Sequence, residues 1–199
     1  KKSAIHVLHV DDDPSLLEIS KLMLLDLNGG FEIDQACCVD EAFKKLAVGN
    51  YDVVISDYEM PQKDGLQFLK ELREQNNDIP FILFTGKGRE EVAIKALNSG
   101  ADRYYNKQGA PETVYGELAH GIQQSIERKK DKVSILLNEM QLQCMLDINK
   151  MLDASDKELL DYALEAITKI TLSKFAFIGL INQDETEMTI HSWSKNAMK

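Results

Sequence analysis

Short apolar runs alternate with amphipathic stretches along the first half of the chain. The runs are rich in β-branched and aromatic residues and nearly continuous, as in strands that are buried on both faces. They are Ile5–Val10, Phe31–Ala36, Val53–Ser56, Phe81–Phe84 and Asp102–Asn106. Between the runs, beginning after Pro14, apolar residues recur at the spacing of a helix. This alternation predicts an α/β fold, with a doubly wound five-stranded parallel sheet of order 2-1-3-4-5.

From Pro111 onward the apolar spacing stays helical for longer than the last helix of such a sheet requires. Two rows of apolar side chains repeat every seven residues between Ile126 and Leu152. The first row is Ile126, Val133 and Met140, and the second is Leu137, Cys144 and Met151. A double row is typical of a parallel coiled coil, so residues 128–154 are predicted to form a helical linker and a homodimer. The alternative is a single helix whose stripe packs on the segment that follows it.

The last stretch, residues 155–199, has a mixed pattern. We expect a helix capped by Asp156, then strands over Phe175–Ile181 and Met188–Trp193. One helix with two strands rarely forms a stable domain by itself, so the pattern predicts a truncated α+β fragment. The order of these elements resembles the opening of a GAF-type sensory domain.

Charge and cysteine content narrow the classes of function. The formal net charge is -10, which argues against a nucleic-acid partner, because a phosphate backbone requires a basic surface. No apolar run is long enough to span a bilayer, so we expect a cytoplasmic protein without a membrane segment. The cysteines are an adjacent pair, Cys37 and Cys38, and a distant Cys144. Without a CxxC spacing, they indicate a reducing compartment and no structural zinc.

Acidic residues follow two of the predicted strands. Asp11 and Asp12 come directly after the first strand, and Asp57 follows the third. These strands are neighbours in the predicted order, so the three carboxylates are expected to meet at one edge of the sheet. Oxygen ligands of this kind suit Mg²⁺. Thr85 and Lys107 arrive from strands four and five, where they can bind phosphoryl oxygens, and a carboxylate held there can form an aspartyl phosphate.

Several motifs together resemble the receiver domain of two-component response regulators, which has a flavodoxin-like fold. They are Asp11-Asp12-Asp13-Pro14, Asp57-x-x-Met60-Pro61-x-x-Asp64-Gly65, Thr85-Gly86 and the late Lys107, in the family's order. The resemblance covers roughly residues 4–127, and the receiver domain is predicted over residues 1–127. Followed by a helix and a GAF-like segment, such a domain is similar to the front of archaeal hybrid sensor histidine kinases, although this chain shows no kinase motifs.

The resemblance also implies roles for individual residues. Asp57 would be the phosphoacceptor, with a histidine kinase or phosphotransfer protein as the phosphodonor. Thr85 and Lys107 would contact the phosphoryl group, and Thr85 and Tyr104 would form the switch. The implied Mg²⁺ ligands are Asp11, Asp12, Asp57 and the backbone carbonyl of Glu59. For Tyr104, a core position is an equally good interpretation, because an aromatic residue in a strand is usually buried.

One position departs from the family. Gln108 follows Lys107 where receivers usually have a proline after a cis peptide bond, so we expect a trans bond and a different aim of Lys107. Two alternatives to the phosphoacceptor remain. A haloacid dehalogenase-type phosphatase also uses aspartate, threonine and lysine at strand ends, and the structural alternative is a dimerisation module that works without phosphorylation.

Overall fold

The computed structural model describes residues 4–27, 30–86, 90–151, 153–184 and 186–198. The chain divides into two compact units, Lys1–Lys130 and Asp131–Lys199. Helix α5 (Pro111–Lys150) begins in the first unit and ends in the second. Each unit is described separately below.

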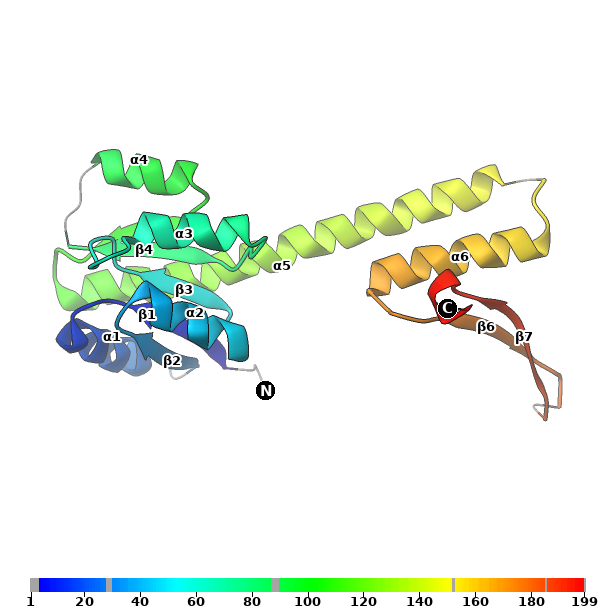
Figure 1. Cartoon of the computed structure of the whole chain (residues 1–199), viewed down its shortest axis with the longest axis horizontal. Helices are drawn as coiled ribbons and strands as arrows, with labels where there is room; N and C mark the ends of the chain where they lie inside the picture. The colour runs from blue at the N-terminus through cyan, green and yellow to red at the C-terminus, as the bar shows by residue number, and fades with distance from the viewer. Residues whose placement is uncertain (1–3, 28–29, 87–89, 152, 185, 199) are drawn as a thin grey trace. The chain divides into compact units, whose positions relative to one another are not determined.

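The first unit contains a parallel sheet of order β2-β1-β3-β4-β5 (Figure 1), which confirms the predicted fold class and strand order. Its strands are β1 (Ile5–Val10), β2 (Phe31–Ala36), β3 (Val53–Ser56), β4 (Phe81–Thr85) and β5 (Arg103–Asn106). Strand β5 begins one residue later than predicted. Asp102 instead accepts a hydrogen bond from the backbone N–H of Phe81 through Oδ2, at 2.8 Å. At the start of β5, the Asp102 side chain therefore accepts a hydrogen bond that a backbone carbonyl would accept in a paired strand.

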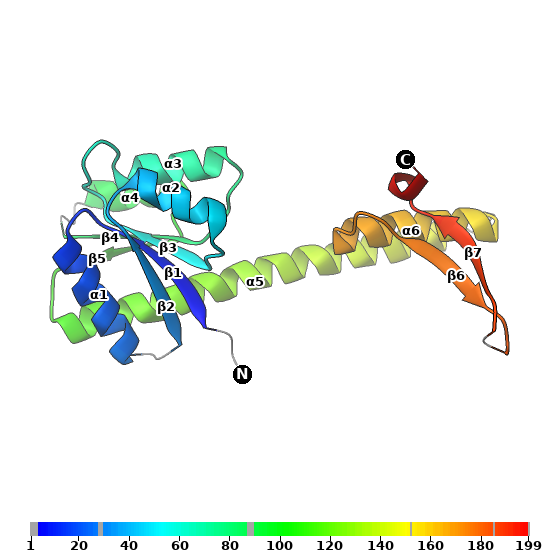
Figure 2. The same cartoon turned by 60° about the horizontal axis from the view of Figure 1, so that its bottom comes forward.

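Helices cover both faces of this sheet (Figure 2). Successive side chains of a strand point to opposite faces, so each strand contributes to two cores. Leu8, Val54 and Phe81 pack toward one core, and Val7, Ile55 and Phe84 toward the other. The first core is closed by α2 (Val39–Val48), α3 (Gly65–Glu74) and α4 (Glu90–Asn98). The second core is closed by α1 (Pro14–Leu27) and the first part of α5.

The start of α3 is held directly against the end of β3. Asp64 caps the helix by accepting from the backbone N–H of Gln67 at 2.7 Å, and Gln67 accepts from Asp64 in return. At Gly65, an added Cβ would lie 2.2 Å from the backbone oxygen of Asp57. The close approach therefore requires glycine, and it fixes the backbone that carries Asp57.

The second unit contains the end of α5, then α6 (Asp156–Thr171), β6 (Phe177–Ile181), β7 (Met188–Trp193) and the short 3₁₀ helix η1 (Lys195–Met198). Strands β6 and β7 form an antiparallel pair. The expected cap, Asp156, is wrong by one residue, because Ser155 caps α6 and exchanges hydrogen bonds with Glu158. The first strand begins at Phe177 instead of Phe175. Within the described residues, no helix is long and apolar enough to cross a bilayer.

Several residues of the predicted coiled-coil rows are covered within this chain, whereas Val133 is 50% exposed. Ile126 is buried in the second core of the first unit. Leu137, Met140 and Cys144 are half-buried, and nearby Tyr162 of α6 donates to Asp147 of α5 at 2.9 Å. Helix α6 therefore lies against this side of α5, which is the alternative raised from the sequence. Leu152, the predicted end of the rows, lies outside the described residues.

Candidate functional site

Asp11 and Asp57 follow neighbouring strands at the same edge of the sheet. The backbone N–H of Asp57 donates to Val10 at 2.8 Å, and that of Asp11 donates to Ala36 at 3.1 Å, so both residues continue the strand pairing. Asp57 is 7% exposed and Asp11 is 1% exposed. Both carboxylates are thus buried at the carboxyl edge of a doubly wound sheet, where this architecture places its ligands.

Lys107 lies between these two carboxylates. Its backbone N–H donates to the backbone oxygen of Thr85 at 2.9 Å, which places the residue beyond the end of β5. Its Nζ is 2.6 Å from Asp11 Oδ2 and 2.6 Å from Asp57 Oδ1. One ammonium group therefore bridges two buried acids and offsets one of their two negative charges.

The pKa directions of this group reflect both burial and pairing. Burial raises the pKa of Asp57, although the hydrogen bond from Lys107 opposes that rise. Burial alone would lower the pKa of Lys107, but the hydrogen bonds to Asp11 and Asp57 outweigh it and the pKa is raised. The raised pKa of Asp57 favours a neutral carboxyl group, whereas the raised pKa of Lys107 favours a charged pair. The charged pair agrees better with the geometry, because hydrogen bonds between ionised partners are shorter than those between neutral ones.

Backbone donors hold the second oxygen of each acid. The N–H of Glu59 donates to Asp57 Oδ2 at 2.6 Å, and the N–H of Asp13 donates to Asp11 Oδ1 at 3.0 Å. Each carboxylate is therefore fixed by Lys107 on one oxygen and by an amide on the other. Such fixed donors orient a nucleophile without reorganisation during a reaction.

These groups surround a hollow of about 200 Å³. Every predicted site residue except Tyr104 lines the hollow. The lining residues are Asp11, Asp12, Asp13, Leu16, Asp57, Glu59, Thr85, Gly86 and Lys107. Asp12 is exposed, whereas Thr85 is buried. The oxygen donors and the open volume fit a Mg²⁺ ion that keeps several waters. Crowded carboxylates cannot all stay ionised without a cation, and Lys107 supplies one positive charge between two of them.

The loop after Lys107 has its own arrangement. Among the described residues there is no cis peptide bond, so the bond before Gln108 is trans, as expected. Gln108 donates through Nε2 to the backbone oxygen of Gly86 and through its N–H to Asn106 Oδ1, both at 2.9 Å. Lys107 nevertheless contacts both acids. The sequence identified Gln108 as a departure from the family but did not predict its hydrogen bond to Gly86, because nothing in the sequence indicates which carbonyl its amide reaches.

Tyr104 lies on β5, away from the hollow. Its ring is half-buried and packs against the core beneath α2, α3 and α4. Burial raises the pKa of its phenol. Within the described residues, the buried hydroxyl has no hydrogen-bond partner. The ring therefore points inward, as expected for an aromatic residue in a strand.

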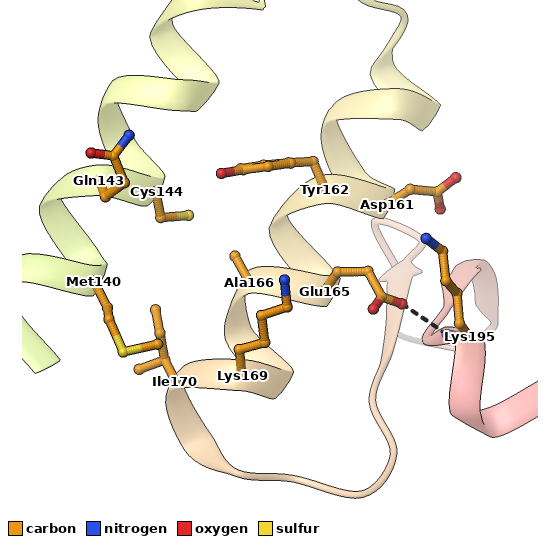
Figure 3. A pocket seen from close by; sticks show the side chains of 10 residues that line it. All are labelled: Met140, Gln143, Cys144, Asp161, Tyr162, Glu165, Ala166, Lys169, Ile170 and Lys195. Carbon is orange, nitrogen blue, oxygen red and sulfur yellow. Dashed lines mark hydrogen bonds between the residues drawn. The ribbon is translucent and has the colours of Figure 1, made fainter.

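A larger hollow, of about 480 Å³, lies within the second unit (Figure 3). Met140 and Cys144 of α5 and Tyr162, Ala166 and Ile170 of α6 point into it, and charged side chains also line it. None of the acids described above lines it. Because the strand-end acids and Lys107 surround the smaller hollow, we place the candidate site there.

Comparison with known proteins assigns the family. A family model described as the response regulator receiver domain matches residues 7–119, which is more than half of the chain. The chain belongs to this family. The matched residues include Asp11, Asp57 and Lys107, so the receiver domain and the candidate site coincide. The match also removes the reason for considering a dehalogenase-type phosphatase.

Individual relatives agree with this assignment. The chain is similar to the probable C4-dicarboxylate response regulator DctR of Halalkalibacterium halodurans, 26% identical over 74% of this chain and 66% of that protein. It is 34% identical to the response regulator SaeR of Staphylococcus epidermidis, over 55% of this chain and 46% of SaeR. The chain thus spans about half to two thirds of these curated relatives. Among solved structures, a Francisella response regulator receiver domain matches with a TM-score of 0.56 and 31% identity, covering 63% of this chain and 98% of that one.

Proposed function

We propose that the receiver accepts a phosphoryl group on Asp57 from a histidine kinase or a phosphotransfer protein, in a reaction that depends on Mg²⁺. The observation that carries the proposal is the contact of Lys107 with Asp57 at the end of β3. A nucleophilic carboxylate, a cation beside it and a hydroxyl nearby are the groups that phosphoryl transfer requires.

The side chains have distinct tasks in this reaction. An oxygen of Asp57 bonds to phosphorus while the bond from phosphorus to the donor's imidazole nitrogen breaks. The ammonium of Lys107 then shifts from the carboxylates toward a phosphoryl oxygen, and the hydroxyl of Thr85 donates to another. Bound Mg²⁺ would supply further positive charge at the phosphoryl oxygens, held by Asp11, Asp12, Asp57 and the backbone carbonyl of Glu59.

Signal output would begin at Thr85 and Tyr104. Movement of Thr85 toward the phosphoryl group changes the space beside β5, where the ring of Tyr104 packs. That change biases the surface formed by α4, β5 and α5. Because α5 continues without a break to Lys150, we propose that it conducts the change to residues 155–199, which would be the start of a GAF-like sensory domain.

We propose that α5 also carries a homodimer contact, through a row other than the one predicted. Ile135, Leu142 and Leu146 recur at helical spacing and are 58%, 62% and 54% exposed. They lie on the side of α5 opposite to Cys144, which faces α6. Leu142→Glu should convert a dimer to a monomer in light scattering, whereas Gln141→Glu, an exposed neighbour, should leave the mass unchanged. An unchanged mass for Leu142→Glu would contradict this contact.

The phosphoacceptor proposal is tested by a phosphoryl mimic. Beryllofluoride with Mg²⁺ should raise the melting temperature of the receiver, because a ligand that binds the folded state stabilises it. The rise should be absent in Asp57→Asn and retained in Asp26→Asn, a matched change at an exposed position of α1. An equal rise in Asp57→Asn would place the bound group elsewhere and refute the proposal.

A further inference from the structure

Three side chains with metal-binding atoms meet in the turn between β2 and α2. The sulfur atoms of Cys37 and Cys38 and a carboxylate oxygen of Glu41 lie within 4.8 Å of one another. Within the described residues, no other group of three or more His, Cys, Asp or Glu side chains gathers this closely. Cys37 is exposed, and the other two side chains are half-buried, so an ion in solution can reach them.

The helix start brings the carboxylate over the thiols. Cys38 is the N-cap of α2, and Glu41 is the third helical residue, from which a side chain reaches back over the turn. Glu41 Oε2 accepts from the backbone N–H of Cys37 at 2.8 Å and from its thiol at 3.0 Å. The other oxygen, Oε1, is 3.3 Å from the ammonium of Lys45. Lys45 therefore orients the carboxylate with Oε2 directed at the thiols.

Beyond the hydrogen bond of the Cys37 thiol to Glu41, the sulfur atoms have no evident role in the fold. Helices usually take Ser, Thr, Asp or Asn at the N-cap, because the side chain then satisfies a backbone donor. Cys38 makes no such hydrogen bond. Neither cysteine belongs to either hydrophobic core, and neither lines the hollow beside Asp57. Two accessible sulfur atoms and an oriented carboxylate are thus left for a ligand.

We propose that Cys37, Cys38 and Glu41 bind one thiophilic divalent cation of the Zn²⁺ or Cd²⁺ class. Thiolate and carboxylate are established ligands of such ions, and a fourth position would remain for water. Binding replaces the two thiol protons with the cation, and the protons pass to solvent. Sequence reasoning predicted no zinc because it looked for a CxxC spacing. The spacing that carries this site is Cys-Cys-x-x-Glu at a helix start.

The proposed site adjoins the receiver's acids without sharing a ligand with them. Cys37 follows Ala36, whose carbonyl accepts the N–H of Asp11 at 3.1 Å. A cation there would hold the end of β2 beside the end of β1. It would also stabilise the folded state, by a free energy that rises with the logarithm of its concentration over the dissociation constant. Because Mg²⁺ prefers oxygen ligands, the two ions would occupy separate sites.

The site is tested by titrating the freshly reduced full chain with Cd²⁺. Thiolate-to-cadmium charge transfer should appear in the ultraviolet and saturate at one equivalent per chain. Cys37→Ser and Cys38→Ser should each abolish the saturable signal, and Glu41→Gln should raise the dissociation constant roughly tenfold or more. Cys144→Ser is the matched control and should leave the titration unchanged. Circular dichroism of each variant shows that the fold is retained.

Three results would overturn the proposal. Absence of the charge-transfer signal in the intact chain would show that the thiols do not bind the ion. Saturation at half an equivalent would show an ion shared between two chains. An unchanged dissociation constant in Glu41→Gln would show a thiol pair without the carboxylate. Zn²⁺ competing for a coloured chelator should give the same order of variants.

Discussion

Gln108 donates through its side-chain amide to the backbone oxygen of Gly86 at 2.9 Å. The contact ties the loop after β5, which begins with Lys107, to the loop after β4, which begins beyond Thr85. These two residues are the ones that we assign to the phosphoryl group. In the family to which this chain belongs, a proline is expected at the position of Gln108, so a side-chain hydrogen bond here takes the place of a stiff ring.

Replacement of Gln108 should weaken this tie. Gln108→Ala should lower the free energy of unfolding by about 1 kcal/mol, the usual net value of one hydrogen bond. Gln108→Pro should cost about 2 kcal/mol, because it also removes the N–H that donates to Asn106. Urea unfolding measures both. Gln123→Ala, at an exposed position of α5, should stay within about 0.5 kcal/mol. A proline variant more stable than the alanine variant would contradict this description of the loop.

Gly65 is predicted to tolerate no side chain. Gly65→Ala places a Cβ 2.2 Å from the backbone oxygen of Asp57 and 2.8 Å from Leu83, so either the helix or the end of β3 must move. We expect a loss of about 2–3 kcal/mol in unfolding free energy and slower phosphoryl acceptance. At Gly116 of α5, an added Cβ has no neighbour within 4 Å. Gly116→Ala should therefore stabilise the chain by about 0.5–1 kcal/mol. Equal effects of the two substitutions would refute the close approach.

Removal of the cation between the acids should be costly, and Mg²⁺ should reduce the cost. Lys107→Met leaves Asp11 and Asp57 buried beside each other, so we expect a loss of about 1–3 kcal/mol. Mg²⁺ should then stabilise this variant more than the unaltered chain, because it takes over the neutralisation. Urea unfolding with and without Mg²⁺ measures the difference. The exposed Lys95→Met should behave like the unaltered chain. An identical effect of Mg²⁺ on Lys107→Met and the unaltered chain would argue against a Mg²⁺ site at these acids.

The two units should unfold separately. In the described part of the second unit, Leu164 is the one hydrophobic side chain that is fully buried, so this unit has a small core. Trp193, the single tryptophan, lies in that unit and contacts Phe177 at 5.7 Å between ring centroids. Its fluorescence should therefore change at a lower temperature than most of the circular dichroism signal.

A pair of substitutions separates the two transitions. Leu164→Ala should lower only the transition that fluorescence reports, and Leu118→Ala, fully buried in the first unit, should lower the main one. One transition, coincident by both probes and shifted by either substitution, would show instead that the chain unfolds as one body.

The sequence alone predicted the strand order of the sheet and the acids at its carboxyl edge. Strands such as Val53–Ser56 are apolar on both faces, so their position and order followed from the pattern, and the acids at their ends followed from the order. The sequence did not predict which segment packs against the apolar side of α5. Apolar positions such as Leu137, Met140 and Cys144 indicate that something covers the helix, but the pattern is the same for a second chain and for α6.

Individual side-chain hydrogen bonds could not be predicted from the sequence either. Ser155 and Asp156 are both good helix caps, so the preference for caps does not decide between them. The contacts of Gln108 with Gly86 and of Glu41 with Cys37 depend on side-chain rotamers and on loop positions. Periodicity and composition contain no information about either.

The most direct test of the phosphoacceptor is the intact mass of the chain after incubation with acetyl phosphate. With Mg²⁺, we predict a gain of one phosphoryl group, no gain after chelation of the metal, and no gain in Asp57→Asn. Asp26→Asn should gain the group as the unaltered chain does. A phosphoryl group that persists in Asp57→Asn, or a chain that gains none with Mg²⁺ present, would contradict the assignment of Asp57.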